Sequence, residues 1–415
     1  MATTDRQAPA GRNAIAFVLL TVCIDAMGFG IIIPVMPDLV REVTNTGFSG
    51  AALWGGYLSF SYAVMQFLFG PTIGNLSDRF GRRPILLISL FMLAADFLIM
   101  AVAPSLLVLF IGRILAGVAA ATHSTAHAFV ADISAREERA RNFGLIGAAF
   151  GVGFILGPII GGFAGEWGTR APFYTAAGLA FLNFCYGAFV LPETLPTGKR
   201  RAFDWQRANP VGGARQIAKF PMVAWFLICA FLFEIANFVY PAVWAYYTKE
   251  AHGWSSAEVG ISLAIVGIGF VIVQGWLIRI VLRHFGEVRT VIGGLLVSIA
   301  GLVGLSVSTT SWMVYAWLPV IALGGVIGPA LTALMSNRTE DDAQGELQGL
   351  KSSVLGITMI ISPLMMTQLF SFFSGADAPV YFPGAPFLAA AILMGLALIP
   401  FAIGLRRNPP ESQGS

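Results

Sequence analysis

Long apolar stretches separated by short polar segments run along nearly the whole chain. Each is about 20 residues long, the length that an α-helix needs to cross the hydrocarbon core of a membrane. The first carries Asp25 at its centre and lacks a small-residue cleavage site, so it is expected to remain as a helix rather than be removed as a signal peptide. The pattern predicts twelve spans: Ala14–Met36, Leu53–Leu76, Ile85–Ala103, Leu106–Ala131, Phe143–Ala164, Pro172–Leu191, Met222–Tyr247, Val259–Leu282, Thr290–Ser308, Met313–Met335, Leu350–Phe372 and Phe382–Leu405.

Composition excludes the water-soluble classes of protein. Hydrophobic residues make up 56% of the 415 positions and charged residues 11%, against about 25% charged residues in soluble domains. The three cysteines, Cys23, Cys185 and Cys229, lie in apolar runs and are expected to act as small hydrophobic residues, not as disulfides or metal ligands. The net charge of +3 is too small to indicate a nucleic-acid partner. The chain is therefore expected to be an all-α integral membrane protein whose surroundings are a lipid bilayer.

Positive charges fall almost entirely on one set of alternate loops. Of the 25 lysines and arginines, 21 lie in one set, Arg41, Arg170 and Lys249 lie in the other, and Arg113 lies inside a span. Loops rich in lysine and arginine stay in the cytoplasm. Both termini and the long loop Glu193–Phe220 are therefore predicted to be cytoplasmic.

The two halves of the chain repeat at a constant offset of 205 residues. Phe80-Gly81 matches Phe285-Gly286, Gly70 matches Gly275, and Pro158 matches Pro363. Six helices, a basic linker and six more helices in the same orientation predict a parallel repeat, which favours two bundles that rock around a central site over a channel. We expect a bundle over 1–192, a cytoplasmic linker over 193–220 and a second bundle over 221–415, acting as a monomer.

The loop between the second and third spans reads Gly-Asn-Leu-Ser-Asp-Arg-Phe-Gly-Arg-Arg-Pro from position 74 to 84. Gly81 permits a chain reversal, and Asp78 can pair with the neighbouring arginines. On this motif the chain resembles the major facilitator superfamily, over its whole length. The residues expected to control which way such a transporter faces are Gly74, Asp78, Arg79, Gly81, Arg82 and Arg83.

Other segments resemble the twelve-helix drug:proton antiporters of that superfamily. The fifth span carries a run of small residues and proline that allows close helix packing. Its key positions are Gly153, Gly157, Pro158, Gly161 and Gly162. The Asp-Ala-Met-Gly start at Asp25, the Ser-Asp-Arg-Phe-Gly loop and the Gly-Glu-Leu-Gln-Gly segment at 345–349 are most similar to tetracycline efflux proteins.

The resemblance implies a function and a location. It implies export of a small amphipathic drug of the tetracycline type in exchange for protons, by alternating access, across a bacterial inner membrane. The driving force would be the proton gradient. No cofactor is implied, although magnesium could travel bound to the substrate.

Four ionisable residues lie at membrane depth: Asp25, Asp96, Arg113 and Glu234. An unpaired charge there costs roughly 2.5–3.5 kcal/mol on insertion scales, so each needs a partner or a water-filled path. Acidic residues at the positions of Asp25 and Asp96 belong to the family pattern, and Arg113 is either a partner for these carboxylates or part of a gate. The resemblance links such residues to proton coupling, although each can instead serve helix packing.

The chain departs from the tetracycline exporters in its second half. Those proteins carry a coupling histidine in the eighth helix and an aspartate in the ninth, whereas this chain has Phe270 and Ser298 there. Neither side chain can carry a proton. Proton exchange would then have to use Asp25, Asp96, Glu234 or the histidines.

Several polar and aromatic residues are candidates for substrate contact. His123 and His127 lie one helical turn apart, a spacing that also suits a metal pair but lacks a third ligand. Aromatic residues of the seventh span could stack on a flat ligand or could simply pack. The candidate substrate-binding residues are Gln66, His123, His127, Asn237, Phe238, Tyr240, Trp244 and Gln274.

Other functions remain open from the sequence. A proton-coupled carrier of a different drug or metabolite fits the same features. A membrane enzyme or receptor would need a catalytic or phosphate-binding motif, and neither a Ser/His/Asp arrangement nor a nucleotide-binding Gly-Lys-Ser/Thr sequence occurs. The chain is therefore predicted not to be an enzyme.

Overall fold

The computed structural model of the protein describes residues 12–120, 122–134, 138–204, 223–340 and 343–407. Residues 205–220 of the predicted linker, with Pro210 and Gly212, lie outside this range, as do the two ends of the chain. Within the described residues the regular structure is entirely helical.

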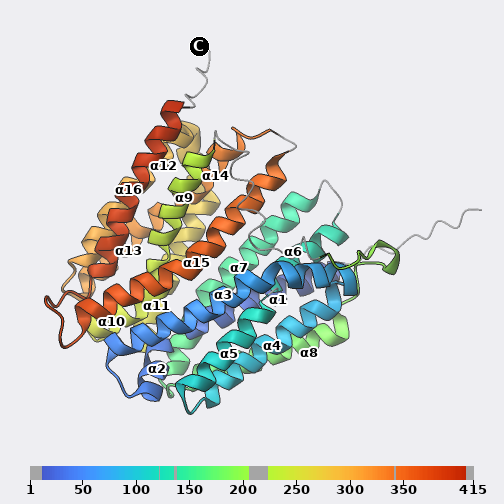
Figure 1. Cartoon of the computed structure of the whole chain (residues 1–415), viewed down its shortest axis with the longest axis horizontal. Coiled ribbons are helices and arrows are strands. Elements are labelled where there is room, and N and C mark those ends of the chain that lie inside the picture. The colour runs from blue at the N-terminus through green and yellow to red at the C-terminus, as the bar shows by residue number, and fades with distance from the viewer. Residues whose placement is uncertain (1–11, 121, 135–137, 205–222, 341–342, 408–415) are drawn as a thin grey trace, which may run out of the picture. The chain divides into compact units, whose positions relative to one another are not determined.

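The described helices belong to two compact units, formed by parts of residues 1–35 with 64–209 and of 36–63 with 210–415 (Figure 1). The long helix α3 passes from the second unit into the first at residue 63. The first unit contains α1 (Arg12–Ile32), the later part of α3 (Phe48–Phe80), α4 (Arg82–Val102), α5 (Leu106–Ala119), α6 (Thr122–Ile133), α7 (Arg139–Gly165), α8 (Ala171–Val190) and the short η2 (Thr197–Lys199).

The second unit contains the helices of the second half of the chain, together with α2 and the start of α3. Its elements are α2 (Met36–Thr44), α9 (Ala224–Asn237), α10 (Val239–His252), α11 (Ser256–Ile272), η4 (Val273–Leu277), α12 (Ile278–Ser306), α13 (Ser311–Leu323), η5 (Gly324–Val326), α14 (Ile327–Ser336), α15 (Gln344–Ser374) and α16 (Ala385–Arg407). The turn η4 is a single π-helical turn between α11 and α12.

The chain has the helices of a multi-pass membrane protein. Within the described ranges, nine helical stretches are long and apolar enough to cross a membrane. One of them, Ser256–Ser306, has 51 residues, more than twice the length of a single pass, and bends where Gly286 has a positive φ of 69°. Ser256–Ser306 counts as two passes, and α3 and the α5/α6 pair add one pass each to the nine stretches. The described helices are therefore consistent with the twelve predicted spans.

Within the described residues, three of the predicted spans contain non-helical breaks. The first ends as α1 at Ile32, turns through Pro34 and resumes as α2; the seventh breaks at Phe238 between α9 and α10. Proline cannot donate a backbone hydrogen bond and clashes with the preceding turn, which explains a break at Pro34 and another just before Pro241. The fourth span, expected to be continuous, ends as α5 at Ala119 and resumes as α6 at Thr122.

The internal repeat is visible in the backbone of each unit. Gly81 and Gly286, 205 residues apart, both have positive φ values, of 107° and 69°. Pro158 and Pro363 both lie inside long helices, α7 and α15. The break at 33–35 and the break at Phe238 also fall at matching positions. The two halves thus share backbone features in addition to the identical residues.

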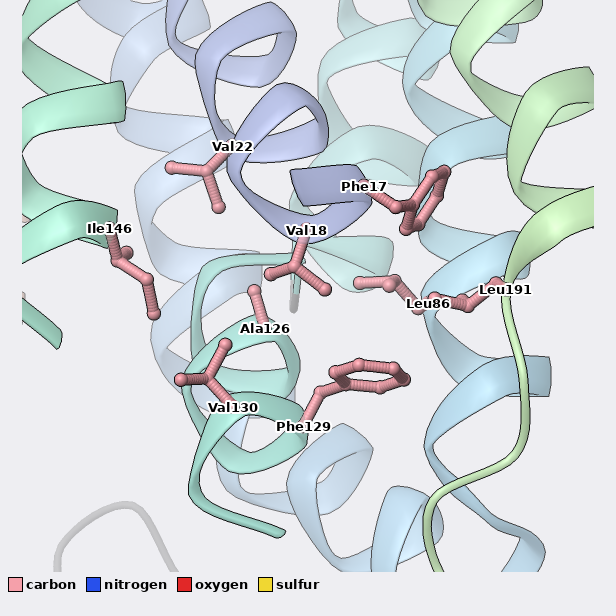
Figure 2. Close-up of a cluster of buried hydrophobic side chains, with 9 residues drawn as sticks. All are labelled: Phe17, Val18, Val22, Leu86, Ala126, Phe129, Val130, Ile146 and Leu191. Carbon is pink, nitrogen blue, oxygen red and sulfur yellow. The ribbon is translucent and has the colours of Figure 1, made fainter. Parts of the chain in front are cut away.

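A buried apolar cluster holds the first unit together where four of its helices meet. Figure 2 shows side chains from α1, α4, α6 and α7, with Leu191 from the segment that follows α8. Phe129 and Val18 are fully buried in it. The cluster members are Phe17, Val18, Val22, Leu86, Ala126, Phe129, Val130, Ile146 and Leu191.

Three glycines of α7 form the surface on which α1 lies, and we call Gly153, Gly157 and Gly161 the glycine seam. A Cβ added at Gly157 would lie 2.6 Å from the carbonyl oxygen of Met27 and 2.8 Å from the Cα of Gly30. Cβ atoms at Gly153 and Gly161 would likewise collide with the backbone of α1. Pro158 packs against Gly30, and Gly162 is buried beside the seam. The predicted close approach of helices at this motif is therefore confirmed.

Replacing Gly157 by valine is expected to destabilise the protein by about 1–3 kcal/mol, because overpacking forces α1 and α7 apart. Gly147→Val is the matched control, since a Cβ at Gly147 meets open space on the same helix. Thermal unfolding in detergent should show a lower midpoint for the first variant alone. Equal midpoints for the two variants would contradict the seam.

Candidate functional site

A buried ion pair joins α4 to α5 in the first unit. The guanidinium of Arg113 contacts the carboxylate of Asp96, whose side chain is only 1% exposed. A Cβ added at Gly112 would lie 3.0 Å from Asp96 Oδ1, so the glycine makes room for the carboxylate against α5. Opposite charges so deeply buried are expected to be stable only together. Of the two roles that the sequence left open for Arg113, partner of a membrane carboxylate or part of a gate, the structure shows the contact that the first requires.

Asp25 lies on α1 in the same unit and is half-buried. It follows Arg12 by 13 residues, or roughly 20 Å of helix, which places it deep within a pass. The neighbouring positions Cys23, Ala26 and Met27 face the glycine seam of α7. Asp25 is thus carried by a helix whose position is fixed by tight packing.

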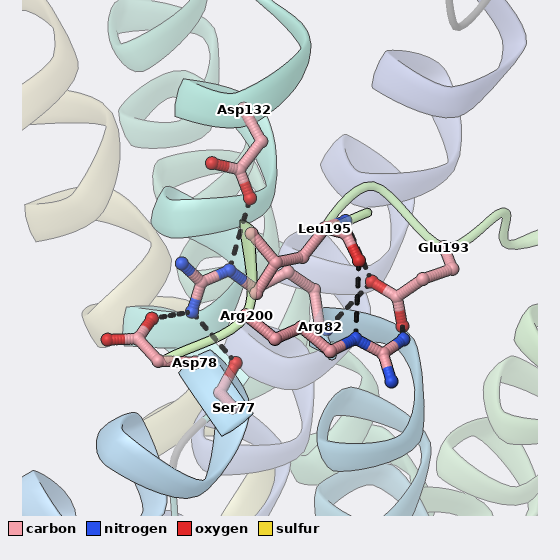
Figure 3. A network of polar contacts seen from close by, with 7 residues as sticks. All are labelled: Ser77, Asp78, Arg82, Asp132, Glu193, Leu195 and Arg200. Carbon is pink, nitrogen blue, oxygen red and sulfur yellow. Dashed lines mark hydrogen bonds and ion pairs between the residues drawn. The ribbon is translucent and has the colours of Figure 1, made fainter. Parts of the chain in front are cut away.

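Arg82 is the centre of the polar network in the motif loop (Figure 3). Its Nη1 lies 2.6 Å from Asp78 Oδ1 and 3.1 Å from Ser77 Oγ, and its Nε lies 3.1 Å from Asp132 Oδ2. Its backbone N–H donates to Glu193 Oε1 at 2.9 Å. One arginine therefore ties the end of α3, the start of α4 and the end of α6 to the segment that follows α8.

The segment after α8 folds back onto this loop. Glu193 also accepts from the backbone N–H of Leu195 at 2.9 Å and lies 3.8 Å from Nη2 of Arg200. The N–H of Arg201 donates to the carbonyl of Asp78 at 3.1 Å. Asn75 donates to the carbonyl of Asp204 at 2.6 Å. Residues 193–204, predicted as the start of the linker, thus pack on the first unit.

The other motif residues have separate roles. Gly81 has a positive φ, and a side chain there would collide with the Glu193 carboxylate, so glycine is required. Arg83 donates to the carbonyl of Ala188 at 2.7 Å. Arg79 is exposed and lies over the ring of Phe80, and Gly74 borders open space.

The predicted substrate residues are divided between the two units. His127, on α6, is half-buried with its ring 5.4 Å from that of Phe143, and the side chain of His123 lies outside the described residues. Gln66 is half-buried in the first unit. In the second unit, Asn237 is half-buried at the end of α9, Phe238 occupies the break before α10, and Gln274 is exposed in η4.

The aromatic residues of α10 pack on one another and on neighbouring helices. The ring of Trp244 lies edge-on to Phe387 and Trp254, and its Nε1 donates to Ser262 Oγ at 2.9 Å. Tyr240 packs against Trp244 and Phe387. Trp244 is only 2% exposed. The structure therefore places Trp244 in a packed aromatic core.

The second unit contains a cavity of about 290 Å³ between α9, α14 and α15, which we call the Glu234–Lys351 pocket. Glu234 enters it from α9 and Lys351 from α15, and Thr332 and Gln348 add polar atoms to a mainly apolar wall. Lys351 Nζ donates to Thr332 Oγ1 at 2.8 Å. Of the predicted coupling residues, Glu234 alone lines this pocket.

Four charged residues lie in contacts or positions that the sequence did not indicate. Lys351 was expected in a loop before a span beginning at Leu350, but α15 starts at Gln344 and carries it inside. Lys249 was also expected in a loop; it lies buried in the last turn of α10, with Nζ 2.6 Å from Asp38 Oδ2 and 2.8 Å from Ser256 Oγ. Asp132 and Glu193 were given no role from the sequence. The four-residue spacing of Leu347, Lys351 and Leu355 could have indicated that Lys351 lies on a helix.

Comparison with known proteins gives the family. The profile of the Major Facilitator Superfamily matches residues 18–280 and, overlapping, 226–415. The class C tetracycline resistance protein of Escherichia coli is 39% identical over 359 residues, covering 86% of this chain and 90% of the relative. The class G protein of Vibrio anguillarum is 37% identical over 399 residues, covering 95% and 99%.

A solved structure supports the same fold. The crystal structure of a bacterial homologue of the human lysosomal transporter Spinster, inward-facing and occupied, aligns with a TM-score of 0.77 at 14% identity, covering 96% of this chain and 98% of that one. At this identity the likeness concerns the fold alone. With the profile match, the related sequences and the repeated membrane helices in agreement, this chain belongs to the Major Facilitator Superfamily of membrane transporters.

Proposed function

We propose that the protein exports a tetracycline-like amphipathic drug from the cytoplasm in exchange for protons, by alternating access. The observation that carries the proposal is the match to tetracycline resistance proteins at 39% and 37% identity over most of both chains. The buried Asp96–Arg113 pair supports it, because a charge pair inside an apolar bundle is costly and indicates function.

Proton coupling is assigned to Asp25, Asp96, Arg113 and Glu234. Asp25 can bind a proton at membrane depth, and Asp96 can exchange Arg113 for a proton as its partner. In the second unit, Phe270 and Ser298 cannot titrate, which leaves Glu234 as the carboxylate on a cavity wall. The proposed cycle therefore uses carboxylates from both halves of the chain.

Substrate contact is assigned mainly to residues at the end of α9. Asn237 and Phe238 follow Glu234 on the chain and border the break before α10. His127, Gln66, Tyr240 and Gln274 are secondary candidates, together with His123. Trp244 would support the site by packing, since its indole is enclosed by Phe387, Trp254 and Ser262.

The motif network is the proposed control of conformation. Arg82 with Asp78, Asp132 and Glu193 forms a set of contacts that can hold together or separate as a bundle moves. The proposed boundaries remain bundles at 1–192 and 221–415 joined by a cytoplasmic linker at 193–220. We place both termini in the cytoplasm and the protein in a bacterial inner membrane, acting as a monomer and taking up drug free or with bound magnesium.

Replacing Asp78 by asparagine is expected to lower the maximal transport rate about tenfold with little change in KM, because a gate affects the cycle more than the binding step. Stability should change little, since a partly exposed ion pair contributes about 0–1 kcal/mol. Asp377→Asn, an exposed loop carboxylate, is the control. A raised KM with an unchanged maximal rate would contradict the gating role.

A drug-susceptibility panel in an efflux-deficient bacterium tests the proposed function. Expression of the wild-type protein should raise the inhibitory concentration of tetracycline, and everted vesicles should accumulate the drug until a protonophore is added. Resistance to other amphipathic compounds without tetracycline resistance would assign a different substrate. Drug accumulation that continues unchanged after the protonophore is added would overturn the exchange mechanism.

A further inference from the structure

The Glu234–Lys351 pocket carries opposite charges on facing helices of one unit. Glu234 belongs to α9 and Lys351 to α15, and α14 completes the wall. Within the described residues, no ion pair within 4.0 Å joins the two side chains. Lys351 instead donates to Thr332 Oγ1, and Thr332 donates to the carbonyl of Gly328 at 2.8 Å. The ammonium is therefore held on the α14 side of the cavity.

The rest of the wall is mostly apolar. Leu227, Phe233, Leu331 and Met335 supply hydrophobic surface next to the charges. Ligand pockets commonly combine such a wall with a few polar groups that orient the ligand, at volumes from about 300 Å³ upward. At about 290 Å³, this pocket suits a small molecule or the polar end of a larger one.

Charge complementarity selects the ligand. Each charge in a low-dielectric pocket gains most from an opposite charge that also makes a hydrogen bond. A cationic ligand would satisfy Glu234 and leave Lys351 with a neutral partner, and an anionic ligand would do the reverse. A molecule with a positive and a negative group beside an apolar body satisfies both.

We propose that the Glu234–Lys351 pocket binds zwitterionic amphipathic molecules, the cationic group on Glu234 and the anionic group on Lys351. This inference rests on the proposed function and deepens it by naming the substrate class. Tetracycline fits the class, since it carries a dimethylammonium group and acidic enols on a fused-ring body. Its 4-dedimethylamino derivative keeps the rings and the enols but lacks the cation.

Binding of these two probes to purified full-length protein, measured by isothermal titration calorimetry, tests the pocket. Glu234→Gln should weaken tetracycline binding about tenfold and the 4-dedimethylamino derivative less than about twofold, since one charge-assisted hydrogen bond is removed. Lys351→Met should weaken both by about tenfold. Glu250→Gln and Arg283→Met, two charges outside the pocket, are controls that should leave both affinities unchanged.

The opposite pattern would overturn the pocket. If Glu234→Gln weakened the binding of both probes equally, Glu234 would not bind the cationic group. If Lys351→Met left both affinities unchanged, Lys351 would not bind the anionic group. A melting curve for each variant separates loss of binding from loss of folding, and a variant that fails to fold is replaced by Glu234→Asp or Lys351→Arg, which should keep the preference for the zwitterion.

A second probe series separates this inference from the proposed function. If the wild type neither binds nor transports tetracycline, the tetracycline assignment fails. Tryptophan, tryptamine and indole-3-propionate then provide a zwitterion, a cation and an anion on one aromatic body. Tighter binding of tryptophan that is lost in Glu234→Gln and Lys351→Met upholds the pocket; equal or no binding of the three overturns it.

Discussion

Arg113→Met is expected to lower transport at least about 100-fold and to destabilise the protein by about 3–5 kcal/mol, the cost of leaving a buried charge without its partner. Asp96 is almost completely buried beside Gly112, so water cannot replace the guanidinium without opening the contact between α4 and α5. Transport in proteoliposomes and thermal unfolding of the purified protein measure the two effects.

A double variant separates the two roles that the pair could have. Asp96→Leu combined with Arg113→Met replaces both charges with apolar side chains, which is often neutral or stabilising in a buried site. The double variant is expected to recover stability and to remain inactive, because the proton-binding carboxylate is gone. Recovery of transport along with stability would reduce the pair to an architectural contact.

Asp25→Asn is expected to abolish transport driven by a pH gradient while preserving drug-for-drug counterflow. Asparagine has nearly the same shape as aspartate but cannot bind and release a proton, so binding and conformational exchange should survive without coupling. Everted vesicles should show a loss of at least about 100-fold in gradient-driven uptake, if the carboxyl is obligatory in the coupled cycle.

The control for this experiment is Asp377→Asn, in the exposed loop before α16. It should transport and exchange drug like the wild type. Normal gradient-driven uptake in Asp25→Asn would remove Asp25 from the coupling path. Loss of counterflow as well as gradient-driven uptake would assign Asp25 to binding or to the structure of α1.

The helices could be predicted from the sequence because the length of an apolar run is a local property of the chain. The four-residue spacing of the seam glycines indicated a surface that a second helix can approach closely, and α1 packs on that surface. Pro34 and Pro241 also marked two of the helix breaks, although the predicted spans ran through them.

The partners in the polar sites could not be predicted because they come from distant parts of the chain. Asp78 was expected to pair with the neighbouring arginines, and it pairs with Arg82, four residues away. Its other carboxylate partners, Asp132 and Glu193, lie 50 and 111 residues away in the sequence. Nothing in a loop sequence shows that the segment after α8 returns to contact it.

The apolar runs also do not show which flanking charged residues lie inside a helix. Lys351 stands beside the first residue of a predicted span, so it was assigned to a loop, yet two turns of α15 precede it. For Trp244 the sequence left ligand contact and packing both open. Its ring packs edge-on to Phe387 and its N–H donates to Ser262 Oγ, two contacts from other helices that the sequence does not show.

Proton movement during drug transport tests the central claim most directly. Wild-type protein is reconstituted into liposomes that contain a pH-sensitive dye, and tetracycline is added on one side without an imposed pH gradient. Proton-coupled export predicts a saturable pH change, with protons moving opposite to the drug, that disappears in Asp25→Asn. Tetracycline transport without any proton movement would contradict it.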